Sequence, residues 1–232
     1  MFKRKILSKL EAWKRDERHK PLILRGARQV GKTTVVNEFG SQFDNYLYFN
    51  LEMNESVRLF EMDIPLNDLV NMLFASLGKS QREGSTLIFI DEIQNSPKTI
   101  ALLRYFYEQR PDLYVIAAGS LLENLVDVNV SFPVGRVMYM ALRPCSFYEF
   151  LGAIGKTNLL AVLSQKPEYT VVFHEQLMHH FNQYTIIGGM PEAVQRYAET
   201  QDIVAIEDVY ETLVQAYKDD SEKYVRGNKL TE

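Results

Sequence analysis

A glycine-bearing loop near the start of this 232-residue chain constrains its fold more than any other feature. Gly26-Ala27-Arg28-Gln29-Val30-Gly31-Lys32-Thr33 matches the pattern G-x-x-x-x-G-K-[ST]. The loop follows the apolar run Leu22-Ile23-Leu24 and precedes a segment with helical spacing, which is the order the motif requires. A loop between a strand and a helix can turn successive backbone N–H groups inward to hold phosphate. The sequence therefore predicts a P-loop that binds a nucleotide.

Individual residues of this loop have distinct predicted roles. Lys32 is expected to contact the β- and γ-phosphates as a mobile charge and to assist catalysis. The Thr33 hydroxyl is expected to ligate Mg²⁺. The predicted nucleotide-binding residues are Gly26, Ala27, Arg28, Gln29, Val30, Gly31, Lys32, Thr33 and Thr34.

Two consecutive carboxylates follow a second apolar run. Asp91 and Glu92 come directly after Leu87-Ile88-Phe89-Ile90. Residues at the carboxyl edge of a parallel sheet face the crevice where ligands bind. Asp91 is predicted to hold Mg²⁺ through water, and Glu92 to polarise the water that attacks the γ-phosphorus. A glutamate directly after the metal-binding aspartate favours ATP hydrolysis over phosphoryl transfer to another acceptor.

Strand-like and helix-like segments alternate through the first two thirds of the chain. The expected strands are Leu22–Leu24, Tyr46–Leu51, Thr86–Ile90, Leu113–Ala118 and Arg136–Ala141. This alternation predicts a P-loop NTPase fold, a three-layer α/β/α arrangement with a mostly parallel five-stranded sheet. An amphipathic first helix, with Ile6, Leu7, Leu10 and Trp13 on one face, is expected to dock on it.

Only helical segments follow the fifth expected strand. We predict an ATPase core over 1–144 and a small all-helical lid over 145–232. The chain stops after a short polar tail, so we expect the lid to be truncated and the native protein to continue.

Three further positions are candidates for contact with the γ-phosphate, each with a second interpretation. Ser120 follows the fourth expected strand, where such ATPases place a residue that senses the γ-phosphate, but a serine there also caps a helix. Arg136 and Arg143 are candidates for a catalytic cation, supplied within the chain or to a neighbouring subunit. The alternative for both is an ordinary surface arginine.

The segment Gly188-Gly189-Met190-Pro191 also has two interpretations. The glycines end one helix and Pro191 begins the next, which explains the segment as a turn. Alternatively, this corner packs over the nucleotide, which makes Pro191 a candidate nucleotide-binding residue.

Composition excludes several other classes of function. The formal net charge of −4 gives no basic footprint, so this segment does not support nucleic-acid binding. The single cysteine, Cys145, excludes an internal disulfide and indicates a reducing compartment. No apolar run reaches the roughly 18 residues that span a membrane, so a cytoplasmic location is expected. His174 and His179 are five residues apart, one too many for a zinc-binding H-E-x-x-H helix.

Several short segments together resemble a family of prokaryotic AAA-type ATPases. The segments that carry the resemblance are Trp13, Lys20-Pro21-Leu22-Ile23-Leu24-Arg25-Gly26-Ala27-Arg28-Gln29-Val30-Gly31-Lys32-Thr33, Asp91-Glu92-Ile93-Gln94, Ala118-Gly119-Ser120, Gly135-Arg136, Arg143-Pro144-Cys145-Ser146-Phe147-Tyr148-Glu149-Phe150 and Gly188-Gly189-Met190-Pro191. The resemblance covers nearly the whole chain. It implies an ATPase core and helical lid, followed in that family by a winged-helix segment and a nuclease-like domain of unknown function. Those later parts are absent from this sequence.

Two functional hypotheses follow from these observations. In the first, the chain hydrolyses ATP with Mg²⁺ to drive or time a conformational change. In the second, it is a slow nucleotide-dependent switch that controls a partner or a missing C-terminal domain. Glu92 favours the first hypothesis. The uncertain source of the catalytic arginine favours the second, and a homo-oligomer would supply that arginine from a neighbour.

Overall fold

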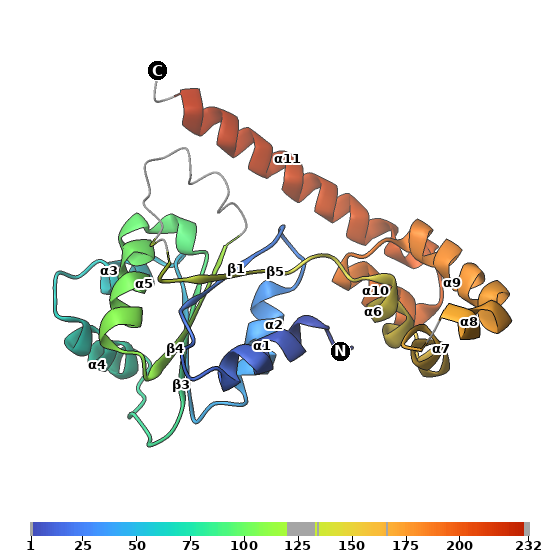
Figure 1. Cartoon of the computed structure of the whole chain (residues 1–232). Coiled ribbons are helices and arrows are strands. Elements are labelled where there is room, and N and C mark those ends of the chain that lie inside the picture. Colours follow the sequence, from blue (N-terminus) through green and yellow to red (C-terminus); the bar gives the residue numbers. More distant parts are fainter. Residues whose placement is uncertain (1, 120–132, 134, 166, 230–232) are drawn as a thin grey trace. The chain divides into compact units, whose positions relative to one another are not determined.

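The computed structural model of the chain consists of two compact units (Figure 1). It describes residues 2–119, 133, 135–165 and 167–229. The first unit spans Lys5–Arg143 and contains the sheet, and we call it the sheet unit. The second consists of Pro144–Glu232 together with Met1–Arg4, and we call it the helical unit.

The sheet unit contains a five-stranded sheet in which every strand pair is parallel. The strand order is β2-β3-β4-β1-β5. The strands are β1 (Leu22–Arg25), β2 (Asn45–Asn50), β3 (Thr86–Asp91), β4 (Leu113–Gly119) and β5 (Met138–Ala141). Each expected strand is present, and the ends differ by one or two residues. The predicted P-loop α/β fold with a parallel five-stranded sheet is confirmed.

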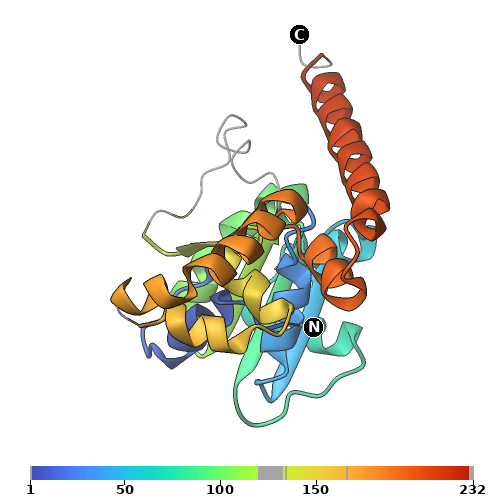
Figure 2. The same ribbon diagram turned by 90° about the vertical axis from the view of Figure 1, so that its right-hand side faces the viewer.

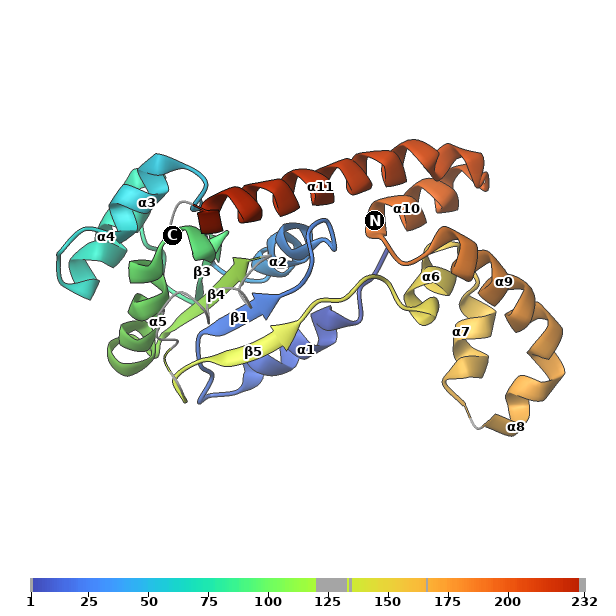
Figure 3. The same ribbon diagram turned by 90° about the horizontal axis from the view of Figure 1, so that it is seen from above.

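Helices cover both faces of this sheet (Figure 3). The helical elements of the unit are α1 (Ile6–Arg15), α2 (Lys32–Gly40), α3 (Asn54–Phe60), α4 (Leu66–Ser76), the 3₁₀ turn η1 (Ile93–Asn95) and α5 (Pro97–Gln109). Helices α1 and α2 lie on one face and α3, α4 and α5 on the other, which completes three layers. Pro65 separates α3 from α4, as its fixed φ angle predicts.

The central strands are apolar because helices cover them from both sides. Every residue of β3 is buried, and β4 is buried except for Tyr114, which is partly exposed. Since β1 and β3 run parallel, their carboxyl ends lie at the same edge of the sheet. The glycine-bearing loop follows β1 and Asp91 ends β3, so the topology places both at this edge.

The first helix docks through the face that its sequence predicts. Ile6, Leu7, Leu10 and Trp13 are buried, and the indole Nε1 of Trp13 donates a hydrogen bond of 2.9 Å to the Lys20 carbonyl. This bond ties α1 to the residue that precedes Pro21 and β1. The helix therefore supports the strand that leads into the glycine-bearing loop.

The helical unit contains α6 (Phe147–Ala153) and the elements that follow it (Figure 2). They are α7 (Thr157–Leu163), α8 (Pro167–Thr170), η3 (Val171–Phe173), α9 (His174–Ile187), α10 (Pro191–Thr200), η4 (Val204–Ile206) and α11 (Glu207–Lys229). Phe150, Ile187 and Val194 are fully buried at the centre of its apolar core. Pro191 is the first residue of α10, where a proline needs no backbone N–H.

The first residues of the chain belong to the helical unit rather than to the sheet unit that follows them. Phe2 packs against the apolar core of the helical unit. The Arg4 Nε lies 3.0 Å from Glu149 Oε1, and both side chains are buried. Glu149 also accepts hydrogen bonds from the backbone and side chain of Ser146 and so completes a capping box at the start of α6. The chain therefore passes between the units twice, after Arg4 and after Arg143.

Within the described part of the chain, no helix combines the length and apolar character needed to cross a membrane.

Candidate functional site

The glycine-bearing loop has the backbone conformation of a phosphate-binding nest at two positions. Gln29 and Gly31 have φ angles of 60° and 88°, in the left-handed region. Such residues turn neighbouring backbone N–H groups toward a common point. Gly31 is the N-cap of α2, which begins at Lys32, so the positive end of the helix dipole lies at the same place.

The loop is seated by contacts on its two sides. The Val30 side chain is fully buried and anchors the loop in the core. On the other side, the Leu142 N–H donates a hydrogen bond of 2.8 Å to the Arg25 carbonyl. A Cβ atom on Gly26 would lie 2.4 Å from the Leu142 carbonyl oxygen, so only glycine fits there. The chain after β5 therefore helps to position the loop, which the sequence motif alone did not indicate.

The Lys32 side chain folds back and contacts the backbone of its own loop. Its Nζ donates hydrogen bonds of 2.8 Å and 2.9 Å to the carbonyls of Gly26 and Ala27. Burial lowers the pKa of Lys32, and the nearby carboxylates of Glu92 and Asp91 oppose that shift. A buried ammonium group held by neutral carbonyls gains from an anionic partner such as phosphate.

Thr33 and Asp91 are brought together from different elements. The Thr33 Oγ1 donates a hydrogen bond of 2.6 Å to Asp91 Oδ2. Asp91 ends β3 and is buried, and this burial raises the pKa of its carboxyl, while the bonds from Thr33 and from the Glu92 N–H oppose the shift. A buried carboxylate beside a hydroxyl is the oxygen-donor set that Mg²⁺ prefers. The residues at this position therefore fit the predicted metal.

Glu92 follows Asp91 in a strained backbone conformation. Its φ and ψ angles are 53° and 44°, in the left-handed region that a residue with a side chain rarely adopts. Its Oε2 accepts a hydrogen bond from the Gln94 side chain. Non-glycine residues in this region are enriched at functional sites.

Other members of the predicted nucleotide-binding set differ in exposure. Ala27, Gln29 and Thr34 are exposed, and Arg28 is half-buried. All of them lie on the loop or on the first turn of α2, and so next to Lys32 and Thr33 in the chain.

The structure does not bring Arg136 to this loop. Arg136 precedes β5, whereas the loop follows the parallel neighbour β1, so the two lie at opposite edges of the sheet. The Arg136 Nε lies 3.2 Å from Glu108 Oε1, an ion pair at the far end of α5. A contact between Arg136 and a nucleotide on the same chain is therefore excluded by the topology. Arg143 follows β5 at the loop's own edge and is exposed.

Two other predicted residues stay predictions. Ser120 lies outside the described residues. Pro191 belongs to the helical unit, where Gly188 has a φ angle of 74° and the Gly189 carbonyl accepts a hydrogen bond of 2.6 Å from the Cys145 N–H. This bond packs the glycine-rich corner against the residues before α6, and the role of the corner toward a nucleotide stays a prediction.

Tyr48 is a neighbour of the site that sequence reasoning missed. It lies on β2 beside β3, and burial raises its pKa, as do the nearby carboxylates of Asp91 and Glu92. An uncharged phenol is therefore favoured next to the acidic pair. Only the pairing of β2 with β3 reveals this position.

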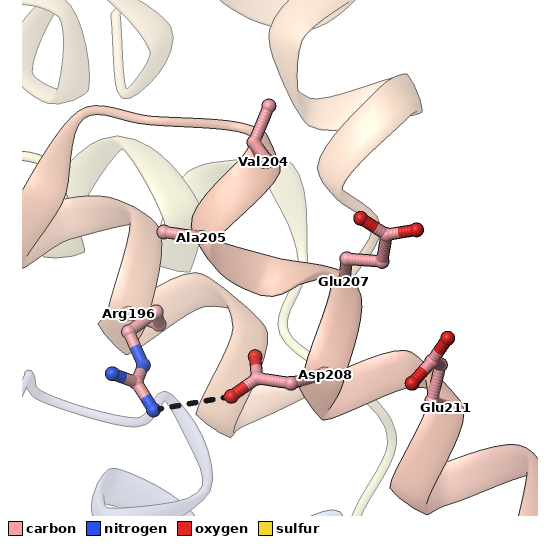
Figure 4. Close-up of a pocket in the computed structure, with 6 residues that line it drawn as sticks. All are labelled: Arg196, Val204, Ala205, Glu207, Asp208 and Glu211. Carbon is pink, nitrogen blue, oxygen red and sulfur yellow. Dashed lines mark ion pairs between the residues drawn. The ribbon is translucent and has the colours of Figure 1, made fainter.

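The helical unit has a hollow of a different chemical character (Figure 4). Its lining residues are Arg196, Val204, Ala205, Glu207, Asp208 and Glu211, and the single cation among them pairs with Asp208 at 3.8 Å. A lining with three carboxylates repels phosphate. No group of three or more histidine, cysteine or acidic side chains suited to a metal occurs among the described residues.

Comparisons with solved structures find distant similarities. They include the ORC1 protein of Aeropyrum pernix in complex with DNA (15% identity, 63% of this chain, 45% of that chain, TM-score 0.41). C. elegans PCH-2 is 13% identical, with 90% of this chain and 68% of that chain covered and a TM-score of 0.47. Drosophila ORC bound to DNA is 15% identical, with 83% of this chain and 58% of that chain covered and a TM-score of 0.47. The chain spans less than half the length of the first of these chains. TM-scores below 0.5 carry no argument about what this chain binds.

Comparisons with sequence families are more informative. No curated protein sequence matches the chain. Residues 178–232 match a domain of unknown function (DUF8612). Residues 18–151, more than half of the chain, match the model of the AAA domain, and this match contains the glycine-bearing loop and the acidic pair. The chain therefore belongs to the AAA domain family and has the fold of a nucleotide-binding ATPase.

Proposed function

We propose that this chain binds ATP with Mg²⁺ and hydrolyses it, and that hydrolysis drives or times a conformational change. The observation that supports this most is the hydrogen bond between Thr33 and Asp91 at the base of the loop. It joins the end of β3 to the start of α2, so that a hydroxyl, a carboxylate and the Lys32 ammonium share one edge of the sheet. Glu92 lies next to them in the chain.

Each of these residues has a proposed task. Lys32 exchanges its two backbone carbonyl partners for oxygens of the β- and γ-phosphates. Thr33 and Asp91 hold Mg²⁺, which when bound neutralises negative charge on the phosphates. Glu92 accepts a proton from the water that attacks the γ-phosphorus, or orients that water. The loop N–H groups hold phosphate oxygens at the start of α2.

A second proposal concerns the source of the catalytic cation. Because Arg136 lies at the sheet edge opposite the loop, we propose that it acts on the nucleotide of a neighbouring subunit. An arginine supplied in this way can raise the rate by roughly 10³–10⁵. Turnover per chain that rises with protein concentration, and that Arg136→Ala abolishes, supports this role. Turnover independent of concentration contradicts it.

Slow turnover in isolation is the alternative function. In that case the chain holds a nucleotide as a switch and uses the bound state to control a partner or a further domain. We propose that 145–232 acts as the helical lid in either case, with Ser120 as sensor and Pro191 near the nucleotide. A single free cysteine, Cys145, supports a reducing, cytoplasmic location.

Calorimetric titration with ATP and with GTP in the presence of Mg²⁺, followed by phosphate release on the same sample, tests the function. Tight ATP binding with release supports an ATPase, and tight binding without release supports the switch. Lys32→Ala should abolish binding. The matched control is Lys79→Ala, since the Lys79 Nζ also donates to a backbone carbonyl but lies outside the loop. Retained ATP affinity in Lys32→Ala would contradict the assignment of the loop.

Substitution of the acidic pair separates binding from chemistry. Glu92→Gln should keep ATP bound and lower turnover by roughly 10²–10⁴, the usual contribution of a general base. Turnover equal to that of the unmodified protein would remove Glu92 from its proposed role.

A further inference from the structure

Gln94 lies beside Glu92 because of the short turn that follows β3. Residues Ile93–Asn95 form the 3₁₀ turn η1, in which the Asn95 N–H donates a hydrogen bond of 3.1 Å to the Glu92 carbonyl. Ile93 is fully buried in the core of the sheet unit and fixes this turn in place. A tight turn of this kind brings the side chain two residues after Glu92 back toward it.

The contact between the two side chains has a defined polarity. The Gln94 Nε2 donates a hydrogen bond to Glu92 Oε2. An ionised carboxylate only accepts hydrogen bonds, so the amide must present its NH₂ group to it. Gln94 Oε1 is buried and has no hydrogen-bond partner among the described residues. Within the described structure, the bond to Glu92 is therefore the hydrogen bond that orients the Gln94 amide.

Glu92 directly follows the carboxylate that contacts the phosphate loop. The Glu92 N–H donates a hydrogen bond of 3.1 Å to Asp91 Oδ1, and Asp91 Oδ2 accepts the hydrogen bond from Thr33. The left-handed backbone of Glu92 is strained and persists only where surrounding contacts enforce it. The buried Ile93 and the Gln94 hydrogen bond supply two of those contacts.

We infer that Gln94 is a positioning residue, whose amide holds the Glu92 carboxylate in the orientation from which it acts on the attacking water. This inference rests on the proposed hydrolysis. Gln94 itself need not touch the nucleotide. Without the amide, Glu92 keeps its place in the chain but loses one of the bonds that fix its side chain.

A role in positioning predicts a specific kinetic pattern. Gln94→Met keeps the length of the side chain and removes the amide, while Gln94→Glu keeps the shape and removes the donor. Both should lower kcat by roughly tenfold to a hundredfold, because a small displacement of a catalytic group is costly. ATP affinity should stay within about twofold, since no phosphate contact changes. If Gln94 only filled space, Gln94→Met, which adds no charge beside Glu92, would preserve activity.

The decisive experiment is a double-mutant cycle in single-turnover phosphate release, with ATP affinity measured by calorimetry on each variant. Gln94→Met should slow release in the unmodified background and have no further effect in the Glu92→Gln background, because it acts through Glu92. The matched control is Gln195→Met, which removes a glutamine that donates to Glu199 at 3.0 Å on the exposed surface of α10. That variant should leave release unchanged.

The outcomes distinguish this inference from the function on which it rests. Equal release by Gln94→Met and the unmodified protein overturns the role of Gln94 and leaves the ATPase function in place. Equal losses from Gln94→Met in both backgrounds also overturn it, since the effect would then not pass through Glu92. ATP binding without any release by the unmodified protein overturns hydrolysis and this role together.

Discussion

The sheet unit and the helical unit both bury charged side chains, but they treat them differently. In the helical unit, the buried Arg4 and Glu149 neutralise each other, and Glu149 also completes a helix cap. In the sheet unit, burial lowers the pKa of Lys32 and raises that of Asp91, so each environment disfavours the charged form. A Mg²⁺–nucleotide complex would supply the opposite charge to both. The contrast teaches that one unit satisfies its buried charges by folding, and we propose that the other does so by binding a ligand.

Removing a buried cation should therefore be most damaging in the helical unit. Arg4→Met leaves Glu149 buried without this partner and should lower the free energy of unfolding of the helical unit by about 3–5 kcal/mol. Arg104→Met removes an exposed partner of Glu108 in the sheet unit and should cost only a few tenths, about 0.2–0.5 kcal/mol. Denaturant titrations followed by far-ultraviolet circular dichroism measure the overall loss, while the single tryptophan, Trp13, reports on the sheet unit alone. Similar losses in the two variants would break the comparison.

Two glycines at close backbone contacts sharpen the comparison further. A Cβ atom on Gly26 meets the Leu142 carbonyl at 2.4 Å, and one on Gly189 meets the Cys145 carbonyl at 2.5 Å. Gly26→Ala should distort the phosphate loop at a cost of about 1–3 kcal/mol and weaken ATP binding by roughly tenfold. Gly189→Ala should destabilise the helical unit by a similar amount.

The effect of Gly189→Ala on ATP affinity decides between the two interpretations of the corner at Pro191. Unchanged affinity, measured by calorimetry on the folded variant, identifies the corner as a turn. A tenfold loss of ATP affinity would show that the corner also acts on the nucleotide. The helical unit would then share in nucleotide binding, and the contrast drawn between the two units would not hold at this corner.

Acid should weaken the sheet unit through its surface ion pairs. The hydrogen bonds from Arg110 hold the pKa of Asp112 below its usual value. A lowered pKa in the folded state means stability that is present above the ordinary value of about 3.9 and is lost as pH falls from there through the lower pKa of the folded state. Because Asp112 is exposed, Asp112→Asn should remove only about 0.2–1 kcal/mol of this dependence. Denaturant titrations followed by Trp13 fluorescence at neutral and acidic pH measure this pH dependence of the free energy of unfolding. If Asp112→Asn left the dependence unaltered, the stabilising role given to the Arg110–Asp112 pair would be contradicted.

Local sequence patterns were enough to predict the sheet and the loop. Each strand is a continuous apolar run or begins near a turn residue, and the loop motif specifies its own backbone, so Lys32 and Thr33 could be placed without tertiary information. Thr33 and Asp91 could both be predicted as Mg²⁺ ligands, because parallel strands end at one edge, but their direct hydrogen bond was not predicted.

Features that depend on which distant segments meet could not be predicted in this way. The contact between Gly26 and Leu142 joins residues more than a hundred positions apart, and no periodicity encodes it. Sequence left open whether Arg136 acts on the nucleotide of its own chain or of a neighbour, since a position before a strand and a position after it look alike in sequence but lie at opposite sheet edges. The contact of Gln94 with Glu92 was missed because it depends on a 3₁₀ turn. Neither helical nor strand spacing predicts that this turn brings side chains two residues apart together.

The two passages of the chain between the units have a consequence for cutting the protein into fragments. A fragment that begins at Pro144 would contain every helix of the helical unit but would lack Phe2 and Arg4. It would therefore lose the apolar side chain that packs against its core and the cation that pairs with Glu149. Conversely, a protease cut after Arg143 in the folded protein would leave the two pieces held together by those first residues. The helical unit is thus contiguous in space but not in sequence, and no single cleavage site can release it whole.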